Sequence, residues 1–447
     1  MNTLFPVICK YILAAVMLIY MIGSFTILSA DDPKRLIWAF RRQIILVVFF
    51  HTAGFIVLMM HEKTWQMFLL YVTELVYIVA YVSAFRIIYP SSSRIILSHM
   101  LMFLAIGFII LARLNFDKAV RQFMMICVGS VMSLVVPKFF EQLRFARGFS
   151  IFCGLAGILL LLVVLLLSSR TYGANLTLEL GPFAFQPSEF VKISFVLMTA
   201  FFFRSGNSFR IVLLSAVFAL VHILILVAST DLGGALIYAA AYIMMLYAAT
   251  GKFRYLLSGA LAGCGAAFAA MKLFSHVQTR ISIWKDPWPL FYGKGSQVCN
   301  SLLGIASGGF MGTGLYQGSP NLIYVVEKDF IFSAVTEEMG ALIGICIILI
   351  SLSCLLKFIQ VTASLSQPFY SLMGTGLSAI YAVQVFLTIG GNIKLIPATG
   401  VTLPLISYGG SSIFSTFILF GIMQELFVQR KSEEERTVEY EEIYEAR

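Results

Sequence analysis

Residues 213–246 read LLSAVFALVHILILVASTDLGGALIYAAAYIMML, which is an almost unbroken apolar run. About 20 apolar residues are enough for a helix to cross the hydrocarbon core of a bilayer, so this run is too long for one crossing. The run breaks at Ser229-Thr230-Asp231-Leu232-Gly233-Gly234, where an acid and two glycines suit a tight turn at the membrane face. The stretch therefore predicts two consecutive membrane-spanning helices, at 209–228 and 231–249.

The same pattern extends over the whole chain of 447 residues. Hydrophobic residues make up 60% and charged residues 12%, whereas soluble globular domains are about half apolar and a quarter charged. Further apolar runs lie at 7–29, 37–60, 66–88, 95–114, 119–138, 151–168, 189–203, 254–274, 330–356, 369–390 and 403–428. The sequence therefore predicts an all-α, polytopic transmembrane helix bundle with about thirteen spans.

Positive charge predicts the orientation of these spans, because cytoplasmic loops carry an excess of Lys and Arg. When the spans alternate, one side of the membrane receives Lys34, Arg35, Arg41, Arg42, Arg86, Arg94, Lys138, Arg144, Arg147, Arg204, Arg210, Lys252, Arg254, Lys357, Arg430 and Lys431. We assign that side to the cytoplasm. The N-terminus is then expected outside, the C-terminus inside, and the loops 169–188, 229–232, 275–329 and 391–402 on the outer face.

Several functional classes find no support in the sequence. The net charge of +9 comes from basic residues scattered singly between apolar runs, so we expect contact with membrane lipids and no nucleic-acid partner. The chain has no GxxxxGK phosphate loop and no HExxH motif, which leaves ATP-driven transport and zinc hydrolysis unsupported. The acidic stretch 431–447 is expected to be a solvated cytoplasmic tail, with partner binding as the alternative.

The outer loop 275–329 combines cations, tryptophans and one acid in a short space. Its first part contains Arg280, Trp284, Lys285, Asp286 and Trp288, and Gln297 follows a glycine pair. Aromatic rings beside cations suit a polar head group at the membrane interface, and glycines let backbone N–H groups approach phosphate oxygens. The competing interpretation is an ordered loop with interfacial tryptophans and tight turns.

Charged residues also occur inside or at the edge of three apolar runs. Glu189 and Lys192 open one span, three residues apart and therefore on one helix face, where they either form a helix cap with its own ion pair or bind a ligand. Asp329 begins another apolar run, with Glu337 and Glu338 two turns further in; at least one of these two glutamates is expected to face the protein interior. Close to the end, 394–412 carries Lys394, two prolines, Ser411 and Ser412 at the membrane surface.

Taken together, these motifs resemble the SEDS family, the shape, elongation, division and sporulation proteins FtsW, RodA and SpoVE. The matching segments are Gln186 to Glu189 with Lys192, Asp231 to Gly233, Trp284 to Gln297, Asp329 to Phe332 with Glu337 to Gly340, and Pro397 to Ser412. The resemblance implies a ten-span core at 93–430 and about three accessory N-terminal spans in 1–92, as in longer RodA-like members.

The resemblance further implies a peptidoglycan glycosyltransferase that polymerises lipid II at the outer face of the bacterial cytoplasmic membrane, with a class B penicillin-binding protein as partner. Glu189, Asp231 and Asp286 are the candidate catalytic carboxylates. Candidate substrate-binding residues are Lys192, Arg280, Trp284, Lys285, Trp288, Gln297, Asp329, Glu337, Lys394, Ser411 and Ser412. A divalent cation, Mg²⁺ or Mn²⁺, is the one cofactor we consider, without assigned ligands.

Two positions depart from the family pattern and keep alternatives open. Leu290 stands where the family commonly has an Asp believed to be catalytic, and the family's Gly-Ala-x-Arg-Trp segment is present only as Gly173-Ala174-Asn175-Leu176-Thr177. Asp286, the only carboxylate of the Trp-Pro stretch, is the replacement base in the polymerase hypothesis. The alternatives are a non-catalytic scaffold that binds lipid II or a penicillin-binding protein, and a flippase for lipid-linked precursors.

Overall fold

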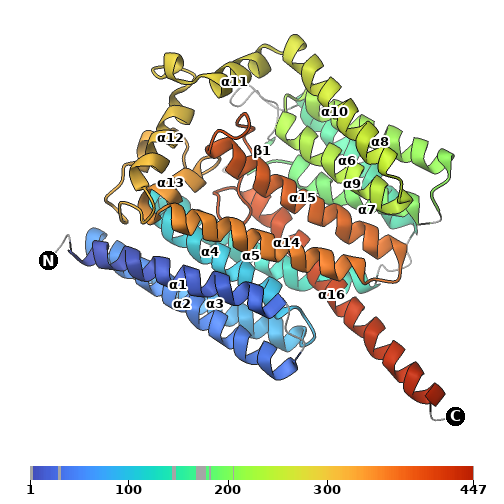
Figure 1. The fold of residues 1–447 in the computed structure, drawn as a ribbon, viewed down its shortest axis with the longest axis horizontal. Helices are drawn as coiled ribbons and strands as arrows, with labels where there is room; N and C mark the ends of the chain where they lie inside the picture. The colour runs from blue at the N-terminus through green and yellow to red at the C-terminus, as the bar shows by residue number, and fades with distance from the viewer. Residues whose placement is uncertain are drawn as a thin grey trace.

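The computed structural model describes residues 4–28, 32–142, 147–167, 178–180, 183–204 and 206–445, and its long helices form one bundle (Figure 1). The long helices are α1 (Leu4–Leu28), α2 (Pro33–Glu62), α3 (Trp65–Ile88), α4 (Arg94–Leu114), α5 (Phe116–Gln142), α6 (Arg147–Leu167), α7 (Ser188–Phe203), α8 (Phe209–Ala228), α9 (Leu232–Thr250), α10 (Phe253–Leu273), α14 (Ala341–Ala363), α15 (Pro368–Asn392) and α16 (Gly410–Glu445). The short elements are β1 (Leu178–Leu180), β2 (Phe183–Phe185), α11 (Ser275–Lys285), η1 (Trp288–Leu290), α12 (Ser296–Gly308), η2 (Pro320–Leu322) and α13 (Ile331–Met339).

Twelve helices of the described residues are long and apolar enough to cross a membrane. The predicted span at 189–203 corresponds to α7. This helix has 16 residues and is shorter than each of the twelve helices. The strands β1 and β2 pair antiparallel over three residues each and hardly change the helical character. The all-α, polytopic prediction is confirmed, and the chain is a multi-pass membrane protein.

Polar side chains at the expected positions begin several helices. Ser93 accepts a hydrogen bond from the backbone N–H of Ile96 at the start of α4, as an N-cap residue does. The turn between α8 and α9 lies where the sequence predicts it: Thr230 has a φ of 62°, and Asp231 caps α9 by accepting from the N–H of Gly234 at 2.8 Å. The acid and the glycines therefore shape this turn directly.

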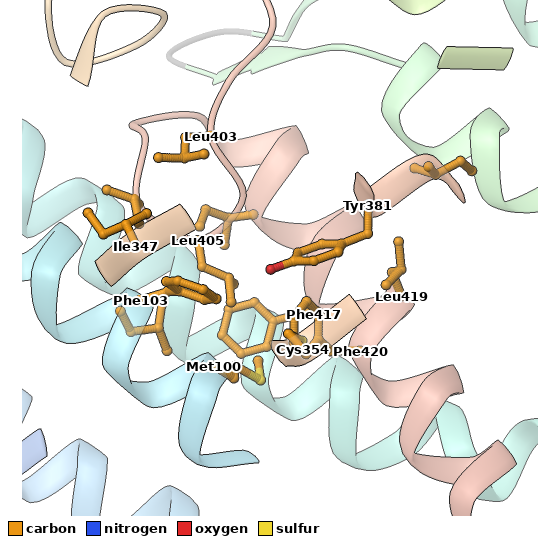
Figure 2. Packing of buried hydrophobic residues seen from close by; sticks show 14 of the residues in the cluster. Met100, Phe103, Ile347, Cys354, Tyr381, Leu403, Leu405, Phe417, Leu419 and Phe420 are labelled. Carbon is orange, nitrogen blue, oxygen red and sulfur yellow. The ribbon is translucent and has the colours of Figure 1, made fainter. Parts of the chain in front are cut away.

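The helix α4 runs through the centre of the core. Every residue from 95 to 112 on it is buried, so α4 is surrounded by protein along its length. Figure 2 shows Met100 and Phe103 of α4 near Cys354 of α14 and near Phe417 of α16. Close packing of this kind, with small residues at close helix approaches, is what holds helices together in lipid.

The N-terminal helices α1, α2 and α3 lie side by side along one flank of the bundle (Figure 1). The helix α1 packs on α2 and α14, α2 packs on α4, and α3 packs on α5. Within this flank His51 and Glu74 are fully buried, with 3.7 Å between His51 Nε2 and Glu74 Oε2. The helices α1, α2 and α3 thus each pack directly against a helix of the rest of the bundle.

The structure corrects two predicted spans. The run 330–356 is broken at Gly340, which has a φ of 98°, a conformation that glycine adopts without steric cost. The helix α13 therefore ends before the spanning helix α14 begins. The run 403–428 begins as a loop because Pro404 and Leu405, with a φ of 65°, interrupt the helix, and α16 starts at Gly410. The helix α16 continues to Glu445, so most of the acidic stretch is helical.

Candidate functional site

A cavity of about 550 Å³ lies where α11 and the first turn of α12 meet the end of α15 and the loop that follows it. Five residues that the sequence analysis selected line this cavity: Arg280, Trp284, Gln297, Asp329 and Lys394. They come from 280–297, 329 and 394, segments that are far apart along the chain. The convergence of separate motifs on one hollow makes this cavity the candidate active site.

The helix α11 presents one polar face to the cavity. His276, Arg280 and Trp284 follow one another at intervals of four residues, which places them on the same side of a helix, and all three line the cavity. The Trp284 Nε1–H donates to the backbone carbonyl of Lys394 at 3.2 Å, which ties α11 to the loop on the other side. This hydrogen bond therefore connects two sides of the cavity.

Gly400 allows Arg280 and Asp329 to come close to each other. It has a φ of 80°, and a β-carbon built on it would lie 3.6 Å from Asp329 Oδ2 and 3.9 Å from Arg280 Nη2. The backbone of Asp329 is fixed from the other side, because Asn392 Nδ2 donates to its carbonyl at 2.7 Å. A guanidinium and a carboxylate thus share one corner of the cavity.

Burial and neighbouring charge shift the acid–base properties in this corner. Burial raises the pKa of Asp329 above its ordinary value, while Lys328 and Arg280 oppose that rise. Burial lowers the pKa of Arg280, against the opposing effect of the carboxylates of Asp329 and Asp231. Burial also raises the pKa of Asp231, and the N–H of Gly234 acts in the opposite direction. The three groups influence one another and form one electrostatic unit.

Lys192 belongs to a second polar group, which we call the Lys192 cluster and define as Glu189, Lys192, Gln384 and Ser415. Lys192 Nζ donates to Glu189 Oε2 at 2.6 Å and to Gln384 Oε1 at 3.0 Å, and Ser415 Oγ donates to Glu189 Oε2 at 2.8 Å. Lys192 is buried, with 3% of its side chain exposed. The predicted ion pair on one face of α7 is present, and it joins α7 to α15 and α16.

The Lys192 cluster and the cavity share a wall formed by the loop before α16. Gln384 Nε2 donates to the carbonyl of Thr402 at 3.1 Å, and the hydroxyls of Thr402 and Ser412 are 2.8 Å apart. Ser411 Oγ accepts from the backbone N–H of Gln186 at 2.9 Å. Ser411 and Ser412 therefore hold this wall together, and neither lines the cavity.

Asp286, Lys285, Trp288 and Glu337 occupy different places from the cavity lining. Asp286 and Lys285 are exposed at the end of α11, where Asp286 Oδ1 accepts from the N–H of Trp288 at 3.3 Å. Trp288, on η1, is 50% exposed. Glu337 is buried in α13 and accepts from the N–H of Ser319 at 2.6 Å. Lys285, Asp286 and Trp288 belong to one loop whose faces cannot be separated from the sequence, whereas Glu337 lies in the apolar run 330–356.

Seven polar lining residues were not selected from the sequence: Ser275, His276, Thr279, Lys294, Thr388, Asn392 and Thr399. A signal existed for two of them, because Gln384, Thr388 and Asn392 recur every four residues within an otherwise apolar span. His276 stands four residues before Arg280, so the helical period of α11 also indicated it. Lys294 carried no such signal, since it lies in a turn without periodicity.

The part of the chain that the structure describes contains no preformed cluster of metal-binding residues. No group of three His, Cys, Asp or Glu residues there is arranged to hold a metal ion. Asp329 alone supplies a carboxylate to the cavity lining among the described residues. The departure at Gly173 to Thr177 lies outside the described residues.

Comparisons with known proteins agree with this architecture. The family model for cell cycle proteins of the FtsW, RodA and SpoVE type matches residues 93–432, a range that begins after α3. The peptidoglycan glycosyltransferase RodA of Mycobacterium tuberculosis is 31% identical over 329 residues, covering 68% of this chain and 69% of that protein. A probable peptidoglycan glycosyltransferase FtsW of Geobacter sulfurreducens is 32% identical over 272 residues, covering 58% of this chain and 71% of its own length.

Two solved structures show the same fold. A chain from work described as structural coordination of polymerization and crosslinking by a peptidoglycan synthase complex superposes with a TM-score of 0.66 at 24% identity. The crystal structure of the rod shape determining protein RodA of Thermus thermophilus superposes with a TM-score of 0.59 at 22% identity. Each alignment covers 76% of this chain and 98% of the other chain.

Proposed function

Because this chain belongs to the FtsW, RodA and SpoVE family of cell cycle proteins, we propose that it is a peptidoglycan glycosyltransferase that polymerises lipid II. Lipid II carries a disaccharide-peptide on an undecaprenyl diphosphate, so its polymerase must bind a diphosphate beside a sugar. The cavity supports this activity, because three basic side chains, Arg280, Lys294 and Lys394, line it together with a single carboxylate. Cations placed where negative charge develops are the main way in which enzymes stabilise a leaving diphosphate.

The reaction forms one glycosidic bond and breaks the bond between the anomeric carbon and a phosphate oxygen. A sugar hydroxyl attacks the anomeric carbon of a second lipid-linked sugar, a base takes the hydroxyl proton, and the diphosphate leaves with the bonding electrons. We assign the base to Asp329, which lines the cavity beside Arg280. Burial raises the pKa of Asp329 and so makes its carboxylate a better proton acceptor. The three cations receive the charge of the leaving group.

The other candidate carboxylates take different roles in this proposal. Asp231 caps α9 and contributes to the electrostatics of Arg280, and Glu189 holds Lys192. Both are therefore assigned to the support of the cavity. Asp286 remains a competing base, because an exposed residue at the end of α11 lies where an incoming polymer end could meet it.

A divalent cation stays a prediction for this site. Mg²⁺ keeps several waters and is commonly held by one or two carboxylates together with substrate phosphates. Asp329 is the one lining carboxylate that would hold such a cation, with a lipid diphosphate supplying the remaining oxygens, and the role of base would then pass to Asp286. The cation would add positive charge at the leaving group, as the three basic side chains already do.

The proposal includes the membrane side and the partner. The placement of basic residues in alternate gaps supports a bacterial cytoplasmic membrane with the N-terminus outside, the C-terminus in the cytoplasm and the cavity facing outward. A class B penicillin-binding protein is the proposed partner, because a polymerised glycan needs a second enzyme to cross-link its peptides.

The decisive experiment is glycan synthesis from lipid II by the purified chain in detergent or nanodiscs, alone and with a class B penicillin-binding protein. We expect polymer from the wild type and a loss of about 10²-fold or more for Asp329→Asn, the usual effect of removing a general base. Asp286→Asn serves as the matched exposed carboxylate. A full loss in Asp286→Asn with an active Asp329→Asn would transfer the base to Asp286.

One observation favours a second function, that of a non-catalytic scaffold. Leu290 replaces the acid that the family commonly carries, and it lies on η1, outside the residues that line the cavity. A scaffold would bind lipid II without forming polymer. Polymer formation that appears only after Leu290→Asp would establish the scaffold, and polymer formation by the wild type would exclude it.

A further inference from the structure

The loop 309–319 connects α12 to η2 and lies at the end of these helices that is remote from the cavity. It is bonded to the α13–α14 junction: the N–H of Thr313 donates to the carbonyl of Glu337 at 2.9 Å, and the N–H of Gly314 donates to that of Glu338 at 2.9 Å. Gly312 approaches Gly340 so closely that a β-carbon on Gly340 would lie 2.5 Å from the nitrogen of Gly312. The loop and this junction therefore move as one piece.

The helices α12 and α13 pack tightly against each other, and the opposite end of this unit forms part of the cavity. A β-carbon on Gly308 would lie 2.3 Å from the carbonyl oxygen of Thr336, so the two backbones are in direct contact. Gln297 at the start of α12 and Asp329, just before α13, both line the cavity. A helix of 13 residues is about 20 Å long, which is the distance between the loop and the cavity end of α12.

The N-terminal helices contact this loop through two hydrogen bonds and one ring stack. Lys10 Nζ on α1 donates to the carbonyl of Gly312 at 2.8 Å. Tyr316 Oη donates to Glu62 Oε1 at 3.0 Å, and the Tyr316 ring stacks on His61 with centroids 3.8 Å apart and an angle of 7°. His61 and Glu62 are the last residues of α2, which shows that α1 and α2 both reach the loop.

A buried ion pair from the central helix supports the same loop. Arg113 of α4 pairs with Glu338 at 2.8 Å, and its guanidinium lies 4.4 Å from the centroid of the Tyr316 ring. Glu338 also accepts from the N–H of Tyr316 at 3.2 Å. Tyr316 has a φ of 64°, a strained conformation for a residue with a side chain, so the surrounding contacts must hold it there.

We propose that α1 and α2 brace the α12–α13 unit, and that Lys10 and Tyr316 are positioning residues for the cavity wall that carries Gln297 and Asp329. Only the expected effect on polymerisation rests on the proposed function. The brace gives α1 and α2, which precede the range matched by the family model, a role in the site. Removal of the brace should loosen the cavity wall without unfolding the bundle.

The test measures amide hydrogen exchange in nanodiscs for the wild type, Lys10→Met and Tyr316→Phe. Tyr316→Phe keeps the stacked ring and removes only the bond to Glu62. We expect exchange to rise about 3- to 10-fold in 309–319 for each variant, the range that one hydrogen bond supports. The rise should extend to the backbone around Gln297 and Asp329, while the melting temperature stays within a few degrees of the wild type.

Matched controls separate positioning from general damage. Lys10→Arg keeps a donor for Gly312 and should restore wild-type exchange, and Tyr11→Phe removes an exposed hydroxyl from the same helix without affecting the loop. In the polymerisation assay, Lys10→Met and Tyr316→Phe should raise the KM for lipid II several-fold, with a smaller change in kcat. Both effects should be absent in the two controls.

The outcomes distinguish this inference from the proposed function. A rise in exchange confined to 309–319, with an unchanged cavity wall, overturns the brace even if the wild type makes polymer. Exchange that spreads to the cavity wall in a protein that makes no polymer supports the brace and rejects the polymerase. If Tyr316→Phe fails to fold, Glu62→Gln, which weakens the same contact with the least change of shape, replaces it in the comparison. If Lys10→Met fails to fold, Lys10→Gln replaces it, because its shorter side chain also loses the bond to Gly312.

Discussion

The Lys192 cluster and the cavity lie on either side of one loop, yet their charges are used differently. In the cluster, Lys192 has two acceptors within 3.0 Å and is almost entirely buried. In the cavity, Arg280 and Asp329 approach the same glycine, and no ion pair joins them within the described residues. Lys192 therefore has little capacity left for a ligand, whereas Arg280 and Asp329 face open volume.

This difference shows that a charged residue inside a membrane protein can serve two ends. A buried charge with complete partners fixes helices against one another, because separating the pair leaves an uncompensated charge in a medium that solvates it poorly. A charge that faces a cavity keeps its capacity to bind. We therefore expect substitutions in the cluster to affect folding first and substitutions in the cavity to affect catalysis first.

The largest expected effect is on stability, from Lys192→Met. It leaves Glu189, whose side chain is only 15% exposed, without its cation, which should cost about 3 kcal/mol in the free energy of unfolding. The measurement is thermal or denaturant unfolding in detergent, with the exposed Lys285→Met as control. The double variant Glu189→Gln with Lys192→Met should recover part of the loss. A stable but inactive Lys192→Met would break the comparison, since Lys192 would then act on substrate.

The next effect is on rate, from Arg280→Ala. Loss of one preorganised positive group at the leaving diphosphate should lower kcat about 10²- to 10³-fold, with little change in melting temperature. Polymerisation of lipid II at saturating substrate gives kcat, and Lys285→Ala, on the same helix but outside the cavity, is the control. Equal losses of kcat in the two variants would show that the position of Arg280 in the cavity does not matter for the reaction.

A smaller effect is expected from Gly400→Ala. The added β-carbon would lie 3.6 Å from Asp329 Oδ2 and 3.9 Å from Arg280 Nη2, and the φ of 80° is unfavourable for alanine. We expect kcat to fall about 10-fold, because a small displacement at the reacting groups is costly. Gly263→Ala, on α10 with open space around it, is the control. Unchanged kinetics would mean that the corner between Arg280 and Asp329 is not where the reaction takes place.

The smallest effect is a pH dependence of stability caused by Glu338. Burial raises its pKa from 4.5 to about 7, against Arg113 and the N–H of Tyr316, while Glu337 adds to the rise. The folded state therefore binds the proton more tightly than the unfolded state, and this contribution is complete below pH 4.5 and is lost as the pH rises through 7. Melting temperatures should fall by a few degrees across that window, and Glu338→Gln should flatten the curve. A wild-type curve that is already flat would show that Arg113 keeps Glu338 ionised.

Much of the fold could be predicted from the sequence, because apolar periodicity and length report membrane crossing directly. The turn at Asp231 and the shared face of Glu189 and Lys192 were also predictable, since both depend on residues that are close along the chain. The break at Gly340 was not, because its cause is the approach of Gly312 from another segment. An apolar run alone does not reveal such a contact.

The candidate site was predictable in part for the same reason. Loops on one side of the bundle bring five of the selected residues to one cavity, namely Arg280, Trp284, Gln297, Asp329 and Lys394. The separation of Arg280 from Asp286 was not predictable, since it depends on where α11 ends and on the direction of the next turn. The contact of Tyr316 with α2 connects residues 254 positions apart, and nothing local indicates it.

The helix α16 begins at the loop that walls the cavity and continues without a proline to Glu445, projecting from the body of the bundle (Figure 1). At 1.5 Å per residue, its 36 residues make a rod about 54 Å long. When one end of this helix rotates or shifts, the other end moves with it. A single residue inserted after Arg430 would turn the acidic segment by about 100° relative to Ser411, which offers a way to reorient that segment while the cavity stays intact.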